Sequence, residues 1–360
     1  MHTFWPDDDV LYAAFCRKDM AFDGVAYIAV RTTGIFCRPG CPARMPLRQH
    51  VVFFRTPHEA MAAGYRACKR CRPIEPPQSA SALIRRLVAE VDAAPTRRWT
   101  AADLEALGID PVTARRHFQR RFGMSFLAYS RAHRVASAFT LIERGASTLS
   151  AQLDVGFESS SAFREAFSKR FGRPPMRAKS SVLLRSAWMD TPLGTMIALT
   201  DSSCLHLLEF SNRARIDLQL ARYRNRLNAA FAPGETAISR TLRQELDLFF
   251  SGRRLTFSVE PAETGTPFQE QVWARLRRIP PGTTLSYAKL AEEIGSPSAV
   301  RAVASANAMN RCAIVTPCHR IVGTDGSLTG YAGGLPRKQW LIDHEARHSG
   351  RAGLAHRRAS

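Results

Sequence analysis

Two proline- and serine-rich segments interrupt the chain, and they constrain its fold more than any other feature of the sequence. One is RPIEPPQSAS, residues 72–81, and the other is GRPPMRAKSS, residues 172–181. Prolines at this density stop helices and are typical of linkers between domains. Near residues 260–269, strand-like alternation also gives way to helical periodicity. We therefore expect a multidomain α+β protein whose domains cover residues 1–77, 78–178, 179–264 and 265–350.

The charge of the chain favours a polyanionic partner. The sequence carries 51 lysines and arginines against 31 aspartates and glutamates, a net charge of +20. Such an excess favours nucleic acid, because each neutralised phosphate releases condensed counterions. A genome rich in arginine codons would give the same excess, so charge alone leaves both explanations open.

The sequence contains no segment of the kind that enters or crosses a membrane. No apolar run approaches the ~20 residues that a bilayer-spanning helix needs. The first ten residues, MHTFWPDDDV, are acidic and lack the apolar stretch of a signal peptide. We therefore expect a cytoplasmic protein without a membrane partner. Its eight cysteines are then metal ligands or nucleophiles rather than disulfides.

Four cysteines in the first segment form two closely spaced pairs. Three residues separate Cys37 from Cys41, two separate Cys68 from Cys71, and 26 residues lie between the pairs. Such spacing allows both thiolates of each pair to reach one tetrahedral zinc ion. The sequence therefore predicts one Zn²⁺ held by four cysteine ligands. On spacing alone, zinc that only stabilises a small domain is the better interpretation.

The residues around these cysteines, RTTGIFCRPGCPAR and GYRACKRCRP, resemble the zinc domain of the Ada family of adaptive-response proteins. The resemblance covers nearly all of residues 1–77. It implies that Cys37 accepts a methyl group from a methylphosphotriester in DNA, and that the other three cysteines complete the metal site. It also implies that three further residues lie near the DNA backbone: Thr33, Arg44 and Arg66.

Zinc chemistry is compatible with this implied role. Zn²⁺ keeps its thiol ligands deprotonated at neutral pH, and four thiolates around one ion remain electron-rich nucleophiles. Methyl transfer turns one thiolate into a thioether, so the site loses one negative charge and repels DNA phosphates less. We therefore hypothesise that methylation of Cys37 strengthens DNA binding.

The second segment contains two helix-turn-helix patterns. In TAADLEALGIDPVTARRHFQRRFG, Gly108 ends a first helix, and Asp110 with Pro111 predicts the N-cap and first residue of a second helix. A weaker copy, TLSAQLDVGFESSSAFREAFSKRFG, follows, so that Phe122 corresponds to Phe171. Two recognition helices placed ~34 Å apart would read successive major grooves of DNA. Four side chains are expected to face a core: Leu104, Leu107, Val112 and Phe118.

The doubled pattern and its ending, VGF followed by FREAFSKRFGRPP, resemble the DNA-binding domain of the AraC family over the whole of residues 78–178. A helical bundle with a charged face would explain each pattern taken alone. The resemblance implies sequence-specific binding to double-stranded promoter DNA, with RNA polymerase as a further partner. The candidates for contact with DNA are Thr113, Arg116, Ser161 and Arg164.

The last segment places Cys318 directly before His319 in IVTPCHRIVG. A cysteine hydrolase needs a base within hydrogen-bond reach of the sulfur. Neighbouring side chains of an extended chain point to opposite faces, so His319 would reach the thiol only through a turn or a water. A metal site with Cys312 lacks a second ligand pair. The residues alone leave open a hydrolase, a metal site, an inert buried cysteine, and a cysteine that attacks only once.

The surrounding sequence, residues 268–345, resembles the DNA alkyltransferases that remove O6-alkyl groups from guanine. The resemblance rests on TPCHRIVGTDGSLTGYAGG and SYAKLAEEIGSPSAVRAVASANAMN. It implies that Cys318 accepts a methyl group from O6-methylguanine or O4-methylthymine after the base has left the stack. It further implies that His319 takes the thiol proton through a water, and that Glu345 orients this histidine.

Further residues of these motifs receive roles from the same resemblance. Asn310 would hold the active-site turn, and Tyr287 would press on the target phosphate. Arg301 would fill the gap left in the duplex, and Tyr331 would contact the flipped base. The small residues at 302 and 304–306 agree with a helix that docks in the narrow minor groove.

Two positions depart from the alkyltransferase pattern. Thr316 stands where the family usually has an apolar residue, and Ala332 stands where relatives often carry a hydroxyl group. We therefore expect weaker activity at Cys318, with the catalytic set intact. The remaining cysteines, Cys16, Cys204 and Cys312, are expected to be structural.

Together the resemblances cover nearly the whole chain, in the order found in Ada-family proteins. They imply a small zinc domain, an all-α double helix-turn-helix domain, a ribonuclease-H-like α/β subdomain over residues 182–262, and a helical, winged-helix-like alkyltransferase domain. Residues 351–360 are expected to form a flexible basic tail. The function implied is that of a monomeric, single-use methyltransferase that becomes a transcriptional activator once Cys37 is methylated. Two alternatives remain: an AraC-type regulator with a purely structural zinc and no repair activity, and a cysteine hydrolase with turnover.

Overall fold

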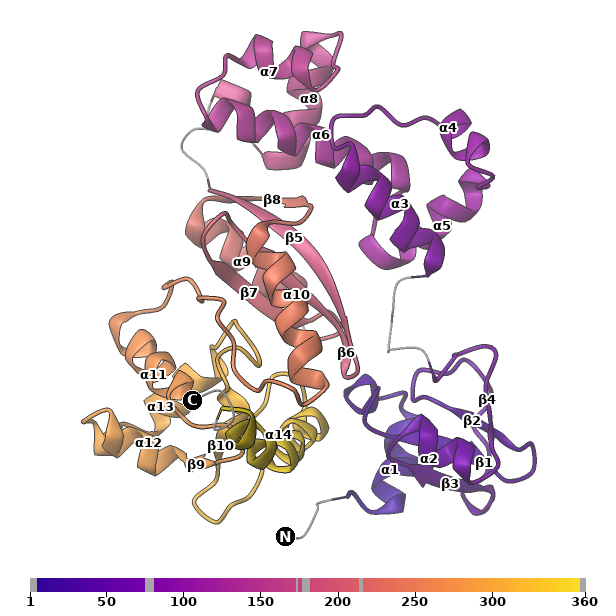
Figure 1. The fold of residues 1–360 in the computed structure, drawn as a ribbon, viewed down its shortest axis with the longest axis vertical. Coiled ribbons are helices and arrows are strands. Elements are labelled where there is room, and N and C mark those ends of the chain that lie inside the picture. The colour runs from indigo at the N-terminus through magenta and orange to yellow at the C-terminus, as the bar shows by residue number, and fades with distance from the viewer. Residues whose placement is uncertain (1–4, 75–80, 173, 177–181, 214–215, 357–360) are drawn as a thin grey trace.

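The computed structural model describes residues 5–74, 81–172, 174–176, 182–213 and 216–356. Much of the two predicted linkers lies outside these ranges, and so do the last four residues of the predicted tail. No helix within the described ranges is both long and apolar enough to cross a bilayer. The order of elements is that of a multidomain α+β protein, which confirms the expected fold class (Figure 1).

The first domain is built on a four-stranded sheet of order β3-β1-β2-β4. Strands β2 and β4 are parallel, with Ile35 opposite Arg66. This pairing brings Cys37, at the end of β2, close to Cys68, whose N–H donates to the Phe36 carbonyl at 3.0 Å. The elements are α1 (Asp8–Cys16), η1 (Met20–Phe22), β1 (Tyr27–Val30), β2 (Ile35–Cys37), η2 (Arg48–His50), β3 (Val51–Phe54), α2 (Pro57–Ala62) and β4 (Arg66–Ala67).

The second domain is helical in its described part and repeats one motif. Helices α4 and α5 form the first predicted helix-turn-helix, α7 and α8 form the second, and α6 connects them (Figure 1). As expected, Asp110 caps α5 and Pro111 is its first residue. Gly123 and Gly172 end α5 and α8 in the same left-handed conformation, with φ of 69° and 72°. The elements are α3 (Ala82–Ala93), α4 (Ala101–Ala106), α5 (Pro111–Phe122), α6 (Phe126–Glu143), α7 (Thr148–Asp154) and α8 (Ser160–Phe171).

The expectation that Val112 faces the core of this domain is wrong. Its side chain is 70% exposed, whereas Leu104 and Phe118 are buried and Leu107 packs against the same core. Ala114 and Phe118, four residues apart, form the buried face of α5. Val112 lies two residues before Ala114 and therefore points to the other side of the helix.

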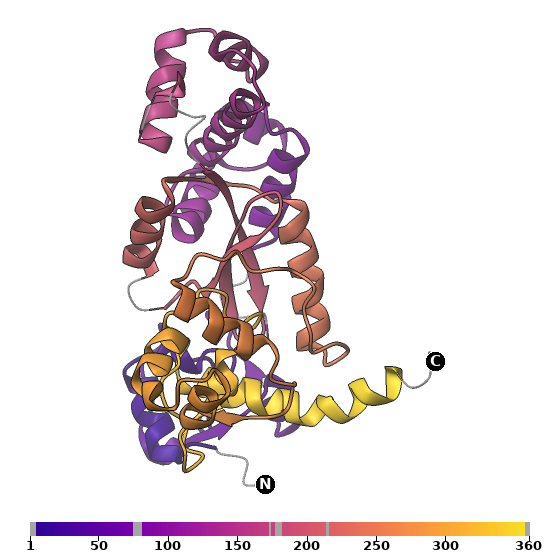
Figure 2. The same cartoon turned by 90° about the vertical axis from the view of Figure 1, so that its left-hand side faces the viewer.

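The third domain is a sheet of order β7-β6-β5-β8, in which only the β5–β8 pair is parallel. Helices α9 and α10 lie on opposite sides of the sheet (Figure 2). Because successive strand residues point to opposite faces, Leu207 packs in the cluster of Tyr223 on α9, and Leu208 packs in that of Leu242 on α10. The elements are β5 (Val182–Thr191), β6 (Gly194–Thr200), β7 (Leu205–Phe210), α9 (Ile216–Leu227), β8 (Ala229–Pro233) and α10 (Ala237–Phe250).

The last domain is mainly helical, and its first helix begins at Pro267, close to the predicted boundary. Helix α14 includes the backbone of residues 351–356. The prediction of a flexible tail is therefore wrong for this part, whose arginine, alanine and leucine residues have high helix propensity. The elements are α11 (Pro267–Arg277), β9 (Leu285–Ser286), α12 (Tyr287–Glu293), η4 (Pro297–Ala299), α13 (Val300–Ala308), η5 (Cys318–Arg320), β10 (Ile321–Val322) and α14 (Leu335–His356).

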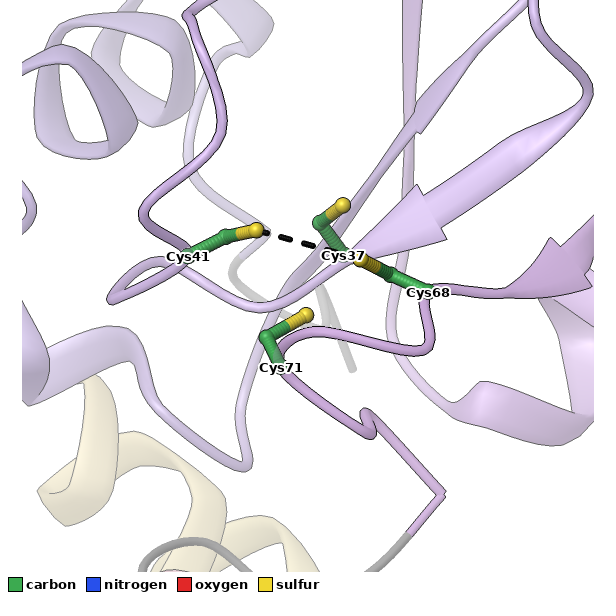
Figure 3. Close-up of side chains that lie close together, drawn as sticks. All are labelled: Cys37, Cys41, Cys68 and Cys71. Carbon is green, nitrogen blue, oxygen red and sulfur yellow. Dashed lines mark hydrogen bonds between the residues drawn. The ribbon is translucent and has the colours of Figure 1, made fainter.

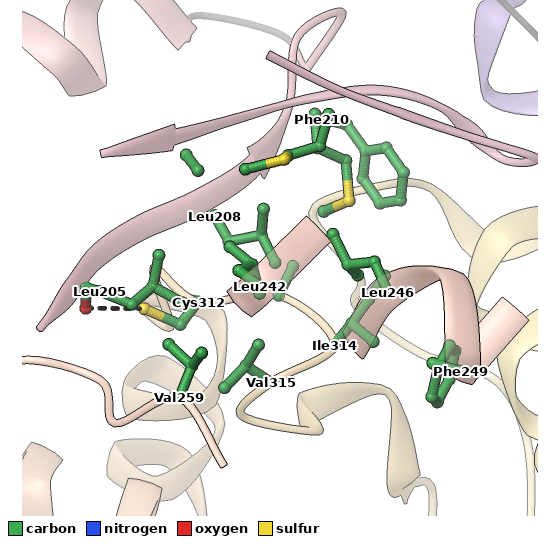
Figure 4. Close-up of a cluster of buried hydrophobic side chains, with 14 of the residues drawn as sticks. Leu205, Leu208, Phe210, Leu242, Leu246, Phe249, Val259, Cys312, Ile314 and Val315 are labelled. Atoms are coloured by element: carbon green, nitrogen blue, oxygen red, sulfur yellow. Dashed lines mark hydrogen bonds between the residues drawn. The ribbon is translucent and has the colours of Figure 1, made fainter. Parts of the chain in front are cut away.

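The segment that leads to Cys318 is fastened to the edge of the sheet. Residues 312–315 belong to the same hydrophobic core as β7 and α10 (Figure 4). The N–H of Leu208 donates to the Arg311 carbonyl at 2.8 Å, and the Leu208 carbonyl accepts from Ala313 N–H at 2.9 Å. Because β7 is an edge strand, these bonds use backbone groups that no other strand occupies. The sheet thus fixes the position of the segment that enters η5.

Candidate functional sites

Four sulfur atoms converge in the first domain (Figure 3). The Sγ atoms of Cys37, Cys41, Cys68 and Cys71 all lie within 4.8 Å of one another. Cys71 is partly exposed and the other three are buried. A convergent set of four soft donors matches the ligand set of a tetrahedral zinc ion.

The electrostatics of this cluster also fit a cation. The hydrogen bond with Cys71, followed by burial, raises the pKa of the Cys37 thiol, and burial raises the pKa of Cys41 to about 11. The hydrogen bond from Cys37 lowers the pKa of Cys71 to about 5. Without a cation, the thiols of Cys37 and Cys41 therefore stay protonated at neutral pH. Bound Zn²⁺ would make all four sulfurs thiolates.

The three residues expected near the DNA backbone lie on the surface of this domain. Thr33 is in the turn between β1 and β2, and Arg66 is on β4. The structure brings these two segments together, because Arg66 N–H donates to the Gly34 carbonyl at 2.8 Å. Arg44 lies three residues beyond Cys41, in a loop.

The four candidates for DNA contact in the second domain lie on α5 and α8. Arg116 and Arg164 are exposed. The Thr113 hydroxyl donates to the capping carboxylate of Asp110 at 2.6 Å, and the Ser161 hydroxyl is 2.8 Å from that of Ser159. The two hydroxyls thus take part in the N-terminal turns of the helices, while the two arginines extend into solvent.

In the last domain, Cys318 begins η5 and is buried beside a cavity of about 180 Å³. The Asn310 amide nitrogen is 2.8 Å from the Thr316 carbonyl oxygen and 3.1 Å from Cys318 Sγ. The Asn310 carbonyl oxygen accepts from Cys312 N–H at 3.0 Å. Burial raises the pKa of Cys318 to about 11, although the Asn310 hydrogen bond opposes this shift. The thiol is therefore neutral at pH 7 and needs a base before it can attack.

His319 has the properties of such a base. It is completely buried, and its Nε2 is 2.9 Å from Glu345 Oε1. Burial lowers the pKa of His319, although Glu345 opposes this shift. The imidazole is therefore neutral at pH 7, with Nε2–H donating to Glu345 and a lone pair on Nδ1. Nδ1 has no hydrogen-bond partner among the described residues, which leaves it able to accept a proton.

Glu345 remains ionised in this buried setting because two side chains donate to it. Arg320 donates through Nε to Oε2 at 2.9 Å and through Nη2 to Oε1 at 2.8 Å. Burial by itself would raise the pKa of Glu345, but His319 and Arg320 together hold it at about 2. The 3₁₀ turn of η5 directs consecutive side chains differently, so Cys318 and His319 can serve one site although they are neighbours.

The other predicted residues of this domain surround the cavity or its approach. Tyr331 lines the cavity, and its buried hydroxyl has no hydrogen-bond partner among the described residues. The hydroxyl of Tyr287 lies close to Gly330, another lining residue. Arg301 is exposed near the start of α13. Of the two departures from the family pattern, Thr316 is buried and Ala332 lines the cavity.

Comparison with known proteins shows the family to which this chain belongs. Family models match three regions, described as "Metal binding domain of Ada" (residues 10–74), "Helix-turn-helix domain" (104–180) and "6-O-methylguanine DNA methyltransferase, DNA binding domain" (267–347). The Escherichia coli protein "Bifunctional transcriptional activator/DNA repair enzyme Ada" is 35% identical over 96% of this chain and 98% of its own length. The chain belongs to the Ada family.

Shorter proteins match the C-terminal half of this Ada-family chain. The "Methylated-DNA--protein-cysteine methyltransferase" of Shigella flexneri is 40% identical over 43% of this chain and 91% of its own length. A crystal structure of Mycobacterium tuberculosis O6-methylguanine methyltransferase covers 46% of this chain and 94% of its own, with 33% identity and a TM-score of 0.41. The enzyme class expected from the sequence, a methylated-DNA–protein-cysteine methyltransferase, is confirmed.

The expectation of one zinc ion with four cysteine ligands is confirmed for this Ada-family chain. The model for the Ada metal-binding domain covers all four cysteines, and their sulfur atoms form a single cluster. The ligand set could be read from the sequence because the two pairs are unusual and closely spaced.

Sequence reasoning missed several charged residues of the Cys318 site. Arg320, which holds Glu345, directly follows His319 in the motif and could have been proposed from its position. Lys338 is completely buried, and burial lowers its pKa to about 8 although Cys318 opposes this shift. Glu209 and Arg213 also line the cavity, but they belong to the sheet domain and its following turn. No local signal in the sequence links them to Cys318.

Proposed function

We propose that this chain repairs methylated DNA at two acceptor cysteines, Cys37 and Cys318, and that methylation of Cys37 converts it into a transcriptional activator of the alkylation response. The geometry around Cys318 carries this proposal. A neutral thiol is held by Asn310 beside a small cavity, and a neutral histidine with an open Nδ1 is backed by an ionised glutamate. This is the arrangement of a nucleophile, a base and an orienting group.

At Cys318 the reaction begins with removal of the thiol proton. A water relays this proton to His319 Nδ1, and Glu345 stabilises the resulting imidazolium. The sulfur attacks the methyl carbon of O6-methylguanine or O4-methylthymine, a carbon–sulfur bond forms, and the carbon–oxygen bond breaks. The electron pair stays on the base, which takes up a proton as the histidine loses its own. The thioether cannot be cleaved by the groups present, so each molecule acts once.

The damaged base reaches the cavity by leaving the duplex. We assign to α13 the role of the helix that enters the minor groove, because its exposed face carries Arg301 and then small residues. Arg301 fills the gap in the duplex, Tyr287 contacts the target phosphate, and Tyr331 contacts the flipped base. The overall charge of +20 supports binding to double-stranded DNA.

At Cys37 the substrate is a methylphosphotriester of the DNA backbone. Cys37, Cys41, Cys68 and Cys71 would hold the zinc ion, which would keep the Cys37 sulfur anionic at neutral pH. The Cys37 thiolate attacks the methyl carbon, the carbon–oxygen bond breaks, and the phosphate oxygen keeps the electron pair as a phosphodiester anion. Three surface residues hold the backbone during this step: Thr33, Arg44 and Arg66.

The second domain supplies the regulatory activity. Its two helix-turn-helix units place α5 and α8 in successive major grooves of a promoter, with contacts from Thr113, Arg116, Ser161 and Arg164. Loss of one negative charge at the zinc site lowers the repulsion between residues 1–178 and DNA phosphates. The activator then recruits RNA polymerase.

This function is carried out by four domains, which we assign to residues 1–77, 78–178, 179–264 and 265–350. The protein acts as a cytoplasmic monomer with double-stranded DNA as its main partner.

The deciding experiment uses duplex DNA methylated with an isotope-labelled methyl group. After incubation, the protein is digested and the label is mapped by mass spectrometry. We expect label on Cys37 and on Cys318, saturating at one methyl group per site. A Cys37→Ser variant should retain label at Cys318 alone. Folded, zinc-loaded protein that acquires no label would overturn the repair function and leave a DNA-binding regulator; ester hydrolysis with turnover would identify a hydrolase.

The switch is tested separately. Protein methylated at Cys37 and unmethylated protein are titrated with the same promoter DNA at matched salt concentration. Tighter binding by the methylated form is expected, and equal affinity would contradict the switch.

A further inference from the structure

The cavity beside Cys318 is completed by an ion pair that comes from another domain. Glu209 lies near the end of β7 and is 1% exposed, and Arg213 follows in the next turn. Arg213 Nη1 donates to Glu209 Oε2, while Glu209 Oε1 accepts from Phe210 N–H at 3.0 Å. Both side chains line the same cavity as the Cys318 thiol.

Contacts on either side of Glu209 hold the strand that carries it. The Arg337 guanidinium lies 4.1 Å from the centre of the Phe210 ring, and Gly333 packs so closely on that ring that an added Cβ would lie 2.9 Å from it. The backbone of Leu208 is bonded on both sides of Cys312, to Arg311 and Ala313. The position of Glu209 relative to the acceptor segment is therefore fixed, unlike that of an exposed salt bridge.

Part of the cavity wall consists of residues with little or no side chain. These are Gly330, Ala332 and Gly333. The cavity, about 180 Å³, is smaller than the ~300 Å³ at which pockets for drug-sized molecules begin. A single flat base with a one-carbon substituent suits this space. A larger substituent has to extend toward a wall.

The chemistry of the charged wall opposes a large apolar substituent. Glu209 is already almost inaccessible to water, whereas 19% of the Arg213 side chain is exposed. An alkyl or aryl group pressed against this wall would exclude the remaining water from the Arg213 guanidinium and offer it no hydrogen bond in return. Burying charged groups without such compensation is unfavourable. A methyl group is smaller and would cover less of the exposed part of the Arg213 guanidinium.

We infer that the Glu209–Arg213 pair is a specificity-determining element of the Cys318 site, which selects methyl over bulkier O6-alkyl groups of guanine. The inference rests on the proposed methyl transfer to Cys318. It assigns to the sheet domain a direct part in substrate choice, through a wall that becomes costly to desolvate as the transferred group grows.

The test compares two substrates of different size in the full-length protein. Single-turnover rates of Cys318 modification are measured by mass spectrometry with duplexes that carry O6-methylguanine or O6-benzylguanine. The double variant Glu209→Leu/Arg213→Met removes both charges together, so neither is left buried alone. We expect the ratio of the benzyl rate to the methyl rate to rise at least about tenfold, the equivalent of 1.4 kcal/mol.

A matched control uses another ion pair of the same domain. Glu235 and Arg243 pair away from the cavity lining, so Glu235→Leu/Arg243→Met should leave the rate ratio of the wild type. If the cavity double variant does not fold, Arg213→Gln decides by the same ratio, because it removes the partly exposed charge and keeps an N–H group that can donate to Glu209. An unchanged ratio in a folded cavity variant overturns the inference. Wild-type protein that takes no methyl group at Cys318 instead overturns the proposed function itself.

Discussion

His319 and Glu345 form a buried pair, with Nε2 of the imidazole 2.9 Å from Oε1 of the carboxylate and less than 2% of either side chain exposed. Arg320 donates to both carboxylate oxygens from the same 3₁₀ turn that carries Cys318. The pair therefore links the nucleophile's turn to α14 and also sets which imidazole nitrogen is free to accept a proton.

The Glu345→Gln substitution should impair both catalysis and folding. A glutamine cannot stabilise an imidazolium, and general bases contribute about 10²–10⁴-fold to rates, so we expect Cys318 methylation to slow about 100-fold. The Arg320 charge would remain buried without its partner, which costs about 3–5 kcal/mol. Single-turnover rates and urea unfolding measure the two effects. Glu292→Gln, at the exposed Lys289 pair, should change neither appreciably.

The rate of Cys318 methylation should depend on pH through His319. Burial lowers the pKa of His319 below its ordinary value of 6.5, so the imidazole stays neutral and able to accept a proton at pH 6.5. We expect a constant single-turnover rate from pH 8 down to below pH 6.5, followed by a decline as His319 becomes protonated. A midpoint of this decline at or above pH 6.5 would contradict the assignment.

Acid should remove the stabilisation that Glu345 provides. The folded-state pKa of Glu345 is about 2, against 4.5 in the absence of interactions. Because the folded value is the lower one, the pair stabilises the protein fully above about pH 4.5, and this contribution is lost as the pH falls toward 2. The difference in Tm between wild type and Glu345→Gln should therefore be constant from pH 7 to 5 and shrink below pH 4. If this difference in Tm instead grew as the pH fell below 4, the predicted direction of the pH dependence would be wrong.

Removal of the Asn310 amide should loosen the turn that carries Cys318. The amide nitrogen lies 2.8 Å from the buried Thr316 carbonyl oxygen, and an unsatisfied buried polar group costs about 1–3 kcal/mol. We expect Asn310→Ala to lower stability by this amount and to slow Cys318 methylation about tenfold or more, since a 1 Å misplacement can cost about 10²-fold. Asn225→Ala, at an exposed position of α9, is the comparison for an asparagine remote from Cys318.

Chelation of zinc should separate the two acceptor sites. Structural zinc sites contribute about 10–16 kcal/mol of apparent binding energy, so the first domain should unfold without its metal. Cys37 methylation should cease, while Cys318 methylation continues, because its proposed residues lie in other domains. Circular dichroism of a chelated sample measures the unfolding of the first domain, and label mapping of the same sample measures methylation at Cys37 and Cys318. Equal loss of label at both cysteines would show that the C-terminal site depends on the zinc domain.

The sequence predicted the elements that depend on local patterns. The cysteine pairs and the Asp110–Pro111 helix start each have a short-range cause, and each is found in the structure. Val112 was misassigned because an isolated apolar residue in the first turn of a helix does not reveal which face is buried. Glu209 and Arg213 could not be predicted, because they reach Cys318 only through the pairing of β7 with residues 311–313.

That pairing sets the smallest unit in which alkyltransferase chemistry can work. A fragment that began at residue 265 would contain Cys318, His319 and Glu345, yet its acceptor segment would have lost the strand to which it is bonded, and its cavity would lack one wall. Truncation of the chain at the boundary between these two domains should therefore abolish the activity at Cys318. A transplantable repair module has to include the whole sheet, and therefore has to start at residue 182, the first residue of β5, or earlier.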